Sequence, residues 1–284
     1  MISVGACATL ACLWEATAPK PGNVYRGADF EDLTYADFLT SAAVVGPILE
    51  RTAAAGVGAA VHAAIDATRT AVGTNTNLGM VLLLAPLAAV PRDLSLPDGI
   101  NAVLDALTAA DTAEVYAAIS LAQPGGLGEV EEADVRDDPP VEITLVEAMR
   151  LAAHRDLVAR QYVTAFQQVF ATAEQVQLCY RSGLALSEAV VHGYLQLLAE
   201  VPDSLIARKC GVALAQEASD RAASVLKSGL PGSSVYQTAT ADLDFWLRAD
   251  GHRRNPGTSA DLLAASLFVL LRDQRLDWPV RFYP

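Results

Sequence analysis

A few of the basic side chains in the sequence lie beside turns and expected helix starts. It contains 20 Lys and Arg against 33 Asp and Glu, a formal net charge of −13, so the chain as a whole repels anions. Any anion binding must therefore depend on local clusters. The five candidate cations are Lys20, held between two prolines, and the adjacent pairs Arg208 with Lys209 and Arg253 with Arg254.

A loop of small polar residues, 73–79, leads directly into the most apolar stretch of the chain, 80–90. A single Asn before a helix is usually its N-cap. Two Asn and two Thr between two Gly exceed what capping needs, and Gly lets a ligand approach the backbone closely. We therefore predict that Asn75, Thr76 and Asn77 face a ligand, to which they offer hydrogen-bond donors and acceptors together.

Three carboxylates occur where expected helices begin or end. Glu15 closes the first helix, Asp203 begins another, and Asp261 lies in the first turn of the last one. A carboxylate at such a point can cap a helix, take a proton from a hydroxyl or hold a divalent cation. Their positions in the sequence do not choose among these roles.

The elements that position these residues are all expected to be helices. Apolar residues recur with helical spacing, no segment shows sustained β alternation, and no repeat of fixed period occurs. The expected helices span 3–16, 34–49, 56–71, 80–90, 99–109, 112–121, 144–171, 173–182, 186–200, 204–227 and 238–248, with a last one ending at 271. The sequence thus predicts an all-α protein, one large helical domain over residues 1–284 with a central cleft.

Composition excludes several classes of protein. Apolar residues make up 52% and charged residues 19% of the chain, which predicts a large buried core. The acidic balance argues against nucleic acid and anionic membranes as partners, and the apolar run 80–90 is about half of the ~20 residues that a membrane span needs. The four Cys show neither CxxC nor zinc-finger spacing, which is typical of buried thiols in a reducing compartment. We expect a soluble, cytoplasmic protein.

Four motifs, by their order and spacing, resemble the triphosphoribosyl-dephospho-CoA synthase family. They are Glu15 with the turn 19–22, the loop 73–79, the stretch 202–211 and the stretch 256–264. The resemblance covers nearly the whole chain and implies an all-helical enzyme that joins ATP to 3′-dephospho-CoA and releases adenine. The family's loop commonly reads Asn-Thr-His-Lys-Gly, so Asn77 and Leu78 here replace an imidazole and an ammonium group.

The reaction implied by this resemblance gives roles to the candidate residues. The triphosphate needs cations, which the five candidate cations and Mg²⁺ would supply, with Asp203 and Asp261 as carboxylate ligands of the metal. Glu15 or Asp203 would take the proton of the acceptor hydroxyl that displaces adenine. The polar side chains of the loop 73–79 would bind the ribose or the base.

The missing His-Lys pair leaves alternatives open. A divergent branch of the family could transfer a pentosyl group to another cofactor precursor, such as a pterin, and a non-catalytic nucleotide-binding helical protein also fits. Helical ADP-ribosyl hydrolases would need carboxylate pairs on helices, whereas Asp137 and Asp138 precede two prolines that prevent a helix. ATP and a nucleotide-like acceptor are the expected partners, and a homo-oligomer is compatible with the sequence.

Overall fold

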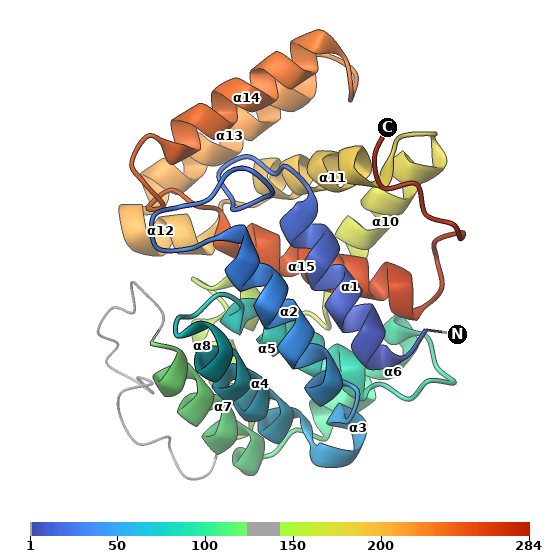
Figure 1. Cartoon of the computed structure of the whole chain (residues 1–284). Helices are drawn as coiled ribbons and strands as arrows, with labels where there is room; N and C mark the ends of the chain where they lie inside the picture. Colours follow the sequence, from blue (N-terminus) through green and yellow to red (C-terminus); the bar gives the residue numbers. More distant parts are fainter. Residues whose placement is uncertain (1, 124–142) are drawn as a thin grey trace.

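The computed structural model describes residues 2–123 and 143–284, and helices are its regular elements there, beside one isolated β-bridge between Tyr25 and Ala28 (Figure 1). The all-α prediction is confirmed. The predicted loop at Asp137 and Asp138 lies outside the described residues. In chain order the helices are α1 (Val4–Thr17), α2 (Tyr35–Leu49), α3 (Thr52–Ala55), α4 (Val57–Val72), α5 (Leu78–Ala89), α6 (Leu96–Asp105), α7 (Ala109–Ala122), α8 (Leu145–Ala152), α9 (Leu157–Val163), α10 (Gln167–Arg181), α11 (Leu186–Glu200), α12 (Ser204–Cys210), α13 (Val212–Ser228), α14 (Ser234–Arg248) and α15 (Gly257–Arg272).

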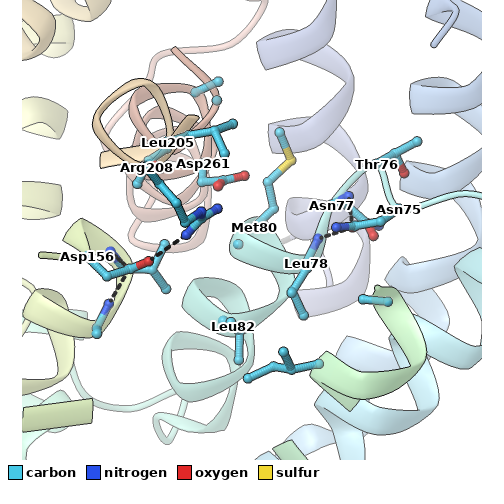
Figure 2. A pocket seen from close by; sticks show the side chains of 18 of the residues that line it. Asn75, Thr76, Asn77, Leu78, Met80, Leu82, Asp156, Leu205, Arg208 and Asp261 are labelled. Atoms are coloured by element: carbon cyan, nitrogen blue, oxygen red, sulfur yellow. Dashed lines mark hydrogen bonds and ion pairs between the residues drawn. The ribbon is translucent and has the colours of Figure 1, made fainter. Parts of the chain in front are cut away.

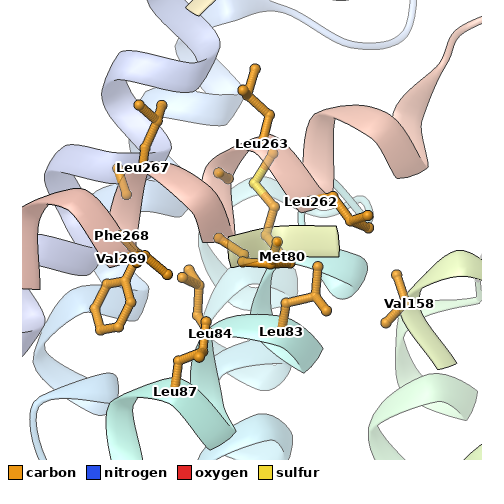
Figure 3. Packing of buried hydrophobic residues seen from close by; sticks show 14 of the residues in the cluster. Met80, Leu83, Leu84, Leu87, Val158, Leu262, Leu263, Leu267, Phe268 and Val269 are labelled. Atoms are coloured by element: carbon orange, nitrogen blue, oxygen red, sulfur yellow. The ribbon is translucent and has the colours of Figure 1, made fainter. Parts of the chain in front are cut away.

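Two helices, α5 and α15, form the centre of the core. Every residue from Met80 to Ala88 in α5 is buried, and so is every residue from Leu262 to Arg272 in α15. A helix that is apolar on all sides has to be surrounded by other elements. The two pack against each other, with Leu83, Leu84 and Leu87 facing the side of Leu263, Leu267 and Phe268 (Figure 3).

The remaining helices cover this pair in layers. On one side α1 packs on α15 and α2, and α2 in turn packs on α4, which packs on α7. On another side α10 and α11 cover α15, and the antiparallel pair α13 and α14 lies outside α11 (Figure 1). Within the described ranges, no helix is both long and apolar enough to cross a membrane.

Two helices expected from the sequence are broken in the structure. The segment 144–171 contains three helices, because the Asp156 side chain caps a new helix start and Ala165 and Phe166 adopt positive φ angles of 49° and 62°. The segment 204–227 is divided at Gly211, whose φ of 92° belongs to the region that favours glycine. The prediction of continuous helices is wrong at these points, since apolar spacing continues across the breaks.

Arg272, the last residue of α15, closes the carboxyl end of α5. It is buried, and its guanidinium donates to the backbone carbonyls of Leu94 at 2.5 Å, Val90 at 2.9 Å and Pro91 at 2.5 Å. Val90 is the C-cap of α5. A cation there satisfies carbonyls that have no helical partner and complements the helix dipole. One side chain thus ties together the two central helices.

We predict that Arg272→Met lowers the free energy of unfolding by about 2–4 kcal/mol, because it leaves several buried carbonyls without donors. Urea denaturation of the two proteins measures the difference. Arg181→Met is the matched control: Arg181 also lies in the last turn of its helix, α10, but its side chain is exposed. Equal losses in the two variants would contradict the capping role.

Candidate active site

A cavity of about 1340 Å³ opens where the N-terminal ends of α5, α9, α12 and α15 approach one another. The end of α4 and parts of α7 and α8 complete its wall. Seven residues predicted as functional line it: Glu15, Asn75, Thr76, Asn77, Arg208, Lys209 and Asp261. Figure 2 labels five of them, Asn75, Thr76, Asn77, Arg208 and Asp261. The motifs that are far apart in sequence therefore share one cavity.

The loop 73–79 forms one wall of this cavity. The Asn75 side chain folds back over the start of α5, and its Oδ1 accepts from the backbone N–H of Leu78 at 3.1 Å and of Asn77 at 3.3 Å. The Thr76 hydroxyl lies 2.6 Å from that of Ser41, which fixes the loop to α2. Asn75 thus caps the helix as well as lining the cavity, so capping and ligand contact do not exclude each other here.

Asn77 is almost fully buried at 4% exposure, yet it lines the cavity. Its Nδ2 donates to Thr68 Oγ1 at 3.1 Å, whereas its buried Oδ1 has no hydrogen-bond partner among the described residues. A buried acceptor without a donor is destabilising. The hydrogen bond to Thr68 therefore holds the side chain in place, while its amide oxygen still lacks a donor.

Asp261 lies against the backbone at the start of α5. A Cβ atom on Gly79 would come within 2.0 Å of Asp261 Oδ2, so glycine at this residue leaves room for the carboxylate in its present position. Within the described ranges this carboxylate accepts no hydrogen bond and forms no ion pair. Burial raises the pKa of Asp261 well above its usual range, and the nearby Glu15 and Asp203 carboxylates raise it further, against a smaller effect of Arg208.

Glu15 lines the cavity from α1 and forms a buried ion pair with Lys20. The two side chains are 3% and 0% exposed, and Lys20 Nζ lies 2.9 Å from Glu15 Oε1. The ammonium also donates to the Glu15 and Ala18 carbonyls. Burial raises the pKa of Glu15, although Lys20 opposes this effect. Lys20 does not line the cavity, so it positions Glu15 from behind.

Asp203 also lies behind the cavity wall. Its Oδ1 accepts from the backbone N–H of Leu205 at 2.8 Å and of Ile206 at 3.0 Å, which caps α12. Its Oδ2 accepts from the backbone N–H of Ser259 at 2.7 Å and from the Ser259 hydroxyl at 2.8 Å, at the start of α15. This carboxylate is fully buried and joins two helix starts. The geometry gives it a positioning role instead of contact with a substrate or metal.

Basic side chains line the wall opposite the loop 73–79. Arg208 Nη1 lies 3.3 Å from Asp156 Oδ2 (Figure 2), and Lys209, the next residue, also lines the cavity. Burial lowers the pKa of Lys209, and the neighbouring Arg208 lowers it further. An anion bound here would relieve this unfavourable concentration of positive charge.

Arg253 and Arg254 are not among the residues that line the cavity. Arg253 is 61% exposed and pairs with Asp250, Nη1 to Oδ2, at 3.4 Å. Arg254 donates to the Trp246 carbonyl at 3.1 Å, and its guanidinium lies over the Trp246 ring, 4.8 Å from the centroid. The predicted contact of these two arginines with phosphate does not fit these positions.

Four basic residues without a predicted role also line the cavity: Arg69, His154, Arg155 and His252. His252 Nδ1 lies 2.9 Å from Asp32 Oδ1, and within the described residues the other three pair with no carboxylate. Arg69 lies in the last turn of α4, immediately before the polar loop, and its place in the chain could have identified it. His154 and Arg155 precede the Asp156 cap, so recognition of that helix start would have identified them as candidates, and the ion pair of Asp156 with Arg208 brings this helix start beside Arg208.

Over residues 2–123 and 143–284 the geometry defines a helical protein with a large cavity that carries cations, amides and a carboxylate without an ion pair. The model of the ATP:dephospho-CoA triphosphoribosyl transferase family matches residues 1–280, so the chain belongs to this family of transferases. Its structure is similar to the crystal structure of an Archaeoglobus fulgidus protein assigned as a triphosphoribosyl-dephospho-CoA synthase. The identity is 25% and the TM-score 0.65, over 83% of this chain and 98% of that one. A comparison with curated proteins gives no match.

We predict that Asp261→Asn raises the stability of the free protein at pH 7 by about 1–3 kcal/mol, since it removes a half-buried carboxylate that accepts no hydrogen bond within the described residues. Because the pKa of Asp261 is raised by folding, the folded state binds more protons than the unfolded state above about pH 4. The stability of wild type therefore decreases as the pH rises through this range, and the variant lacks that decrease.

Thermal unfolding from pH 4 to 8 measures this difference, which should shrink toward pH 4. Glu174→Gln serves as the control, because Glu174 is exposed on α10. A variant that is less stable than wild type at pH 7 would show that the carboxylate has a partner that stabilises it.

Proposed function

We propose that this cavity binds ATP and a dephospho-CoA acceptor and transfers the triphosphoribosyl group from one to the other. The observation that supports this most directly is the distribution of charge around Asp261. On one side the carboxylate contacts the start of α5 beside the amide loop, and on the other it interacts with Arg208. Neutral amides suit a ribose and base, and the cationic wall suits a triphosphate.

The size of the cavity supports a reaction between two substrates. Sites for a single drug-sized ligand commonly occupy about 300–1,000 Å³, and this cavity has about 1340 Å³. Part of its wall is apolar, formed by Leu82 of α5, Ile119 of α7 and Met149 of α8. This part would hold the methylene-rich pantetheine arm of the acceptor.

The proposed transfer forms one bond and breaks one. The acceptor oxygen bonds to C1′ of the ATP ribose, the C1′–N9 bond breaks, and adenine leaves with the electron pair and takes up a proton. The proton of the acceptor hydroxyl passes to the Glu15 carboxylate. The raised pKa of Glu15 brings it nearer to the working pH, where a general base is most effective, and Lys20 fixes its position.

Mg²⁺ is part of the proposal because of Asp261. Among the described residues, no group of three or more His, Cys, Asp or Glu could hold a metal by itself. In nucleotide sites, however, Mg²⁺ is commonly held by one or two carboxylates together with substrate phosphates. Of the cavity carboxylates, Glu15, Asp32 and Asp156 each form an ion pair with a basic residue, and Asp261 forms no ion pair in the described ranges. Asp261 therefore fits the metal, whose charge would offset that of the triphosphate.

The replacement of the family's usual lysine by Leu78 removes one cation from the loop. Lys209 and Arg155 line the cavity without a carboxylate partner in the described part of the chain. We propose that these two side chains neutralise more of the phosphate charge here than in relatives that have a lysine in the loop.

The transfer is tested by incubating the protein with ATP, Mg²⁺ and dephospho-CoA. Chromatography should show one adenine released for each acceptor that mass spectrometry finds enlarged by a triphosphoribosyl group. A parallel arm offers a hydroxyl-bearing pterin, and another omits the acceptor. Adenine release in the pterin arm but not in the dephospho-CoA arm would identify the pterin as the acceptor. ATP binding without adenine release in any arm would contradict the transfer reaction and indicate a non-catalytic nucleotide-binding protein.

We predict that Arg208→Ala weakens MgATP binding by about 1.5–3 kcal/mol, the range for hydrogen bonds to charged groups. Calorimetric titration measures this, and Arg253→Ala should bind as wild type does because Arg253 lies away from the cavity. EDTA should weaken ATP binding to wild type but have little effect on Asp261→Asn. Equal losses in the two arginine variants would contradict the placement of the triphosphate, and a normal response of Asp261→Asn to EDTA would contradict its metal role.

A further inference from the structure

The side-chain oxygen of Asn77, on the polar loop 73–79, has no role in the proposed chemistry. Its side chain is 4% exposed and lines the cavity, and Thr68 takes up only its Nδ2 group. Oδ1 is left buried and without a donor in the described part of the protein. A ligand with an N–H group at this point would satisfy it.

Asn75 presents the opposite group two residues earlier. Because its Oδ1 accepts from two backbone N–H groups, Leu78 at 3.1 Å and Asn77 at 3.3 Å, the amide orientation is fixed. Nδ2 is therefore the remaining polar atom, and no described residue accepts its hydrogens. Asn75 and Asn77 both line the cavity (Figure 2). Together they offer one acceptor and one donor to the same ligand.

Apolar side chains surround this amide pair. Phe38 of α2 lines the cavity and lies three residues before Ser41, on the same helix face. Since Ser41 is hydrogen-bonded to Thr76, Phe38 is brought to the side of the amide loop. Leu33 and Leu78 line the cavity as well. A flat ring with polar groups on one edge suits such surroundings, because aromatic side chains stack well on nucleobases.

We propose that Asn77 and Asn75 select the purine of the nucleotide substrate. Asn77 Oδ1 accepts from the exocyclic amino group of adenine, and Asn75 Nδ2 donates to the ring nitrogen beside that group. This inference rests on the proposed use of ATP. Guanine and hypoxanthine carry a carbonyl oxygen in place of the amino group, which would face the Asn77 acceptor. Two acceptors facing each other exclude such bases.

The test compares three nucleotides that differ at the 6-position: ATP, ITP and purine riboside triphosphate, which carries hydrogen there. Wild type should bind MgATP roughly 10-fold or more tightly than either analogue in calorimetric titrations, as expected for the loss of a buried hydrogen bond. In Asn77→Ala the ATP affinity should fall to that of purine riboside triphosphate, so the preference disappears.

Asn255→Ala is the matched control. Asn255 lines the same cavity, and its buried Oδ1 also has no partner in the described ranges, but it lies on the loop before α15. This variant should keep the wild-type preference for ATP. A preference lost in Asn255→Ala and kept in Asn77→Ala would overturn the assignment. If Asn77→Ala does not fold, equal binding of the three nucleotides by wild type still overturns it. Failure of all three nucleotides to bind would contradict the proposed function itself.

Discussion

The structure depends on the burial of two helices, α5 and α15, that have no polar face. A buried helix end has to find partners for backbone groups that the helix itself leaves free. Arg272 supplies them at the carboxyl end of α5, Asn75 at its amino end, and Asp203 at the start of α15. These three side chains therefore all act at helix ends, and the cavity lies where amino ends converge.

This constraint explains why much of the fold can be predicted from the sequence. The apolar run 80–90 is local, and it alone requires a buried helix preceded by a polar loop. The same reasoning fails at Gly211 and at Asp156, where a helix stops and another begins without a change in apolar spacing. Glycine and aspartate are common inside predicted helices, so only the backbone angle or the capping bond distinguishes a break.

The candidate site was harder to predict because its roles are decided by tertiary pairing. Asp203 and Asp261 look alike in sequence, each near the start of a helix. In the structure one accepts four hydrogen bonds and the other, in the described ranges, none. Arg253 likewise resembles Arg208 until the fold shows which of the two reaches the cavity. Local composition identifies such candidates, but it cannot determine what each carboxylate or guanidinium faces.

The contact between Gly79 and Asp261 also restricts how this protein can change over time. Any side chain at residue 79 would meet the carboxylate at 2.0 Å, and the obstacle is the Asp261 side chain itself. Substitutions at the two sites are thus coupled. A lineage that enlarges residue 79 has to move the Asp261 carboxylate away from the start of α5 or replace it with a smaller side chain. Descendants that keep the aspartate in its present position therefore keep glycine at 79, whatever else in the loop diverges.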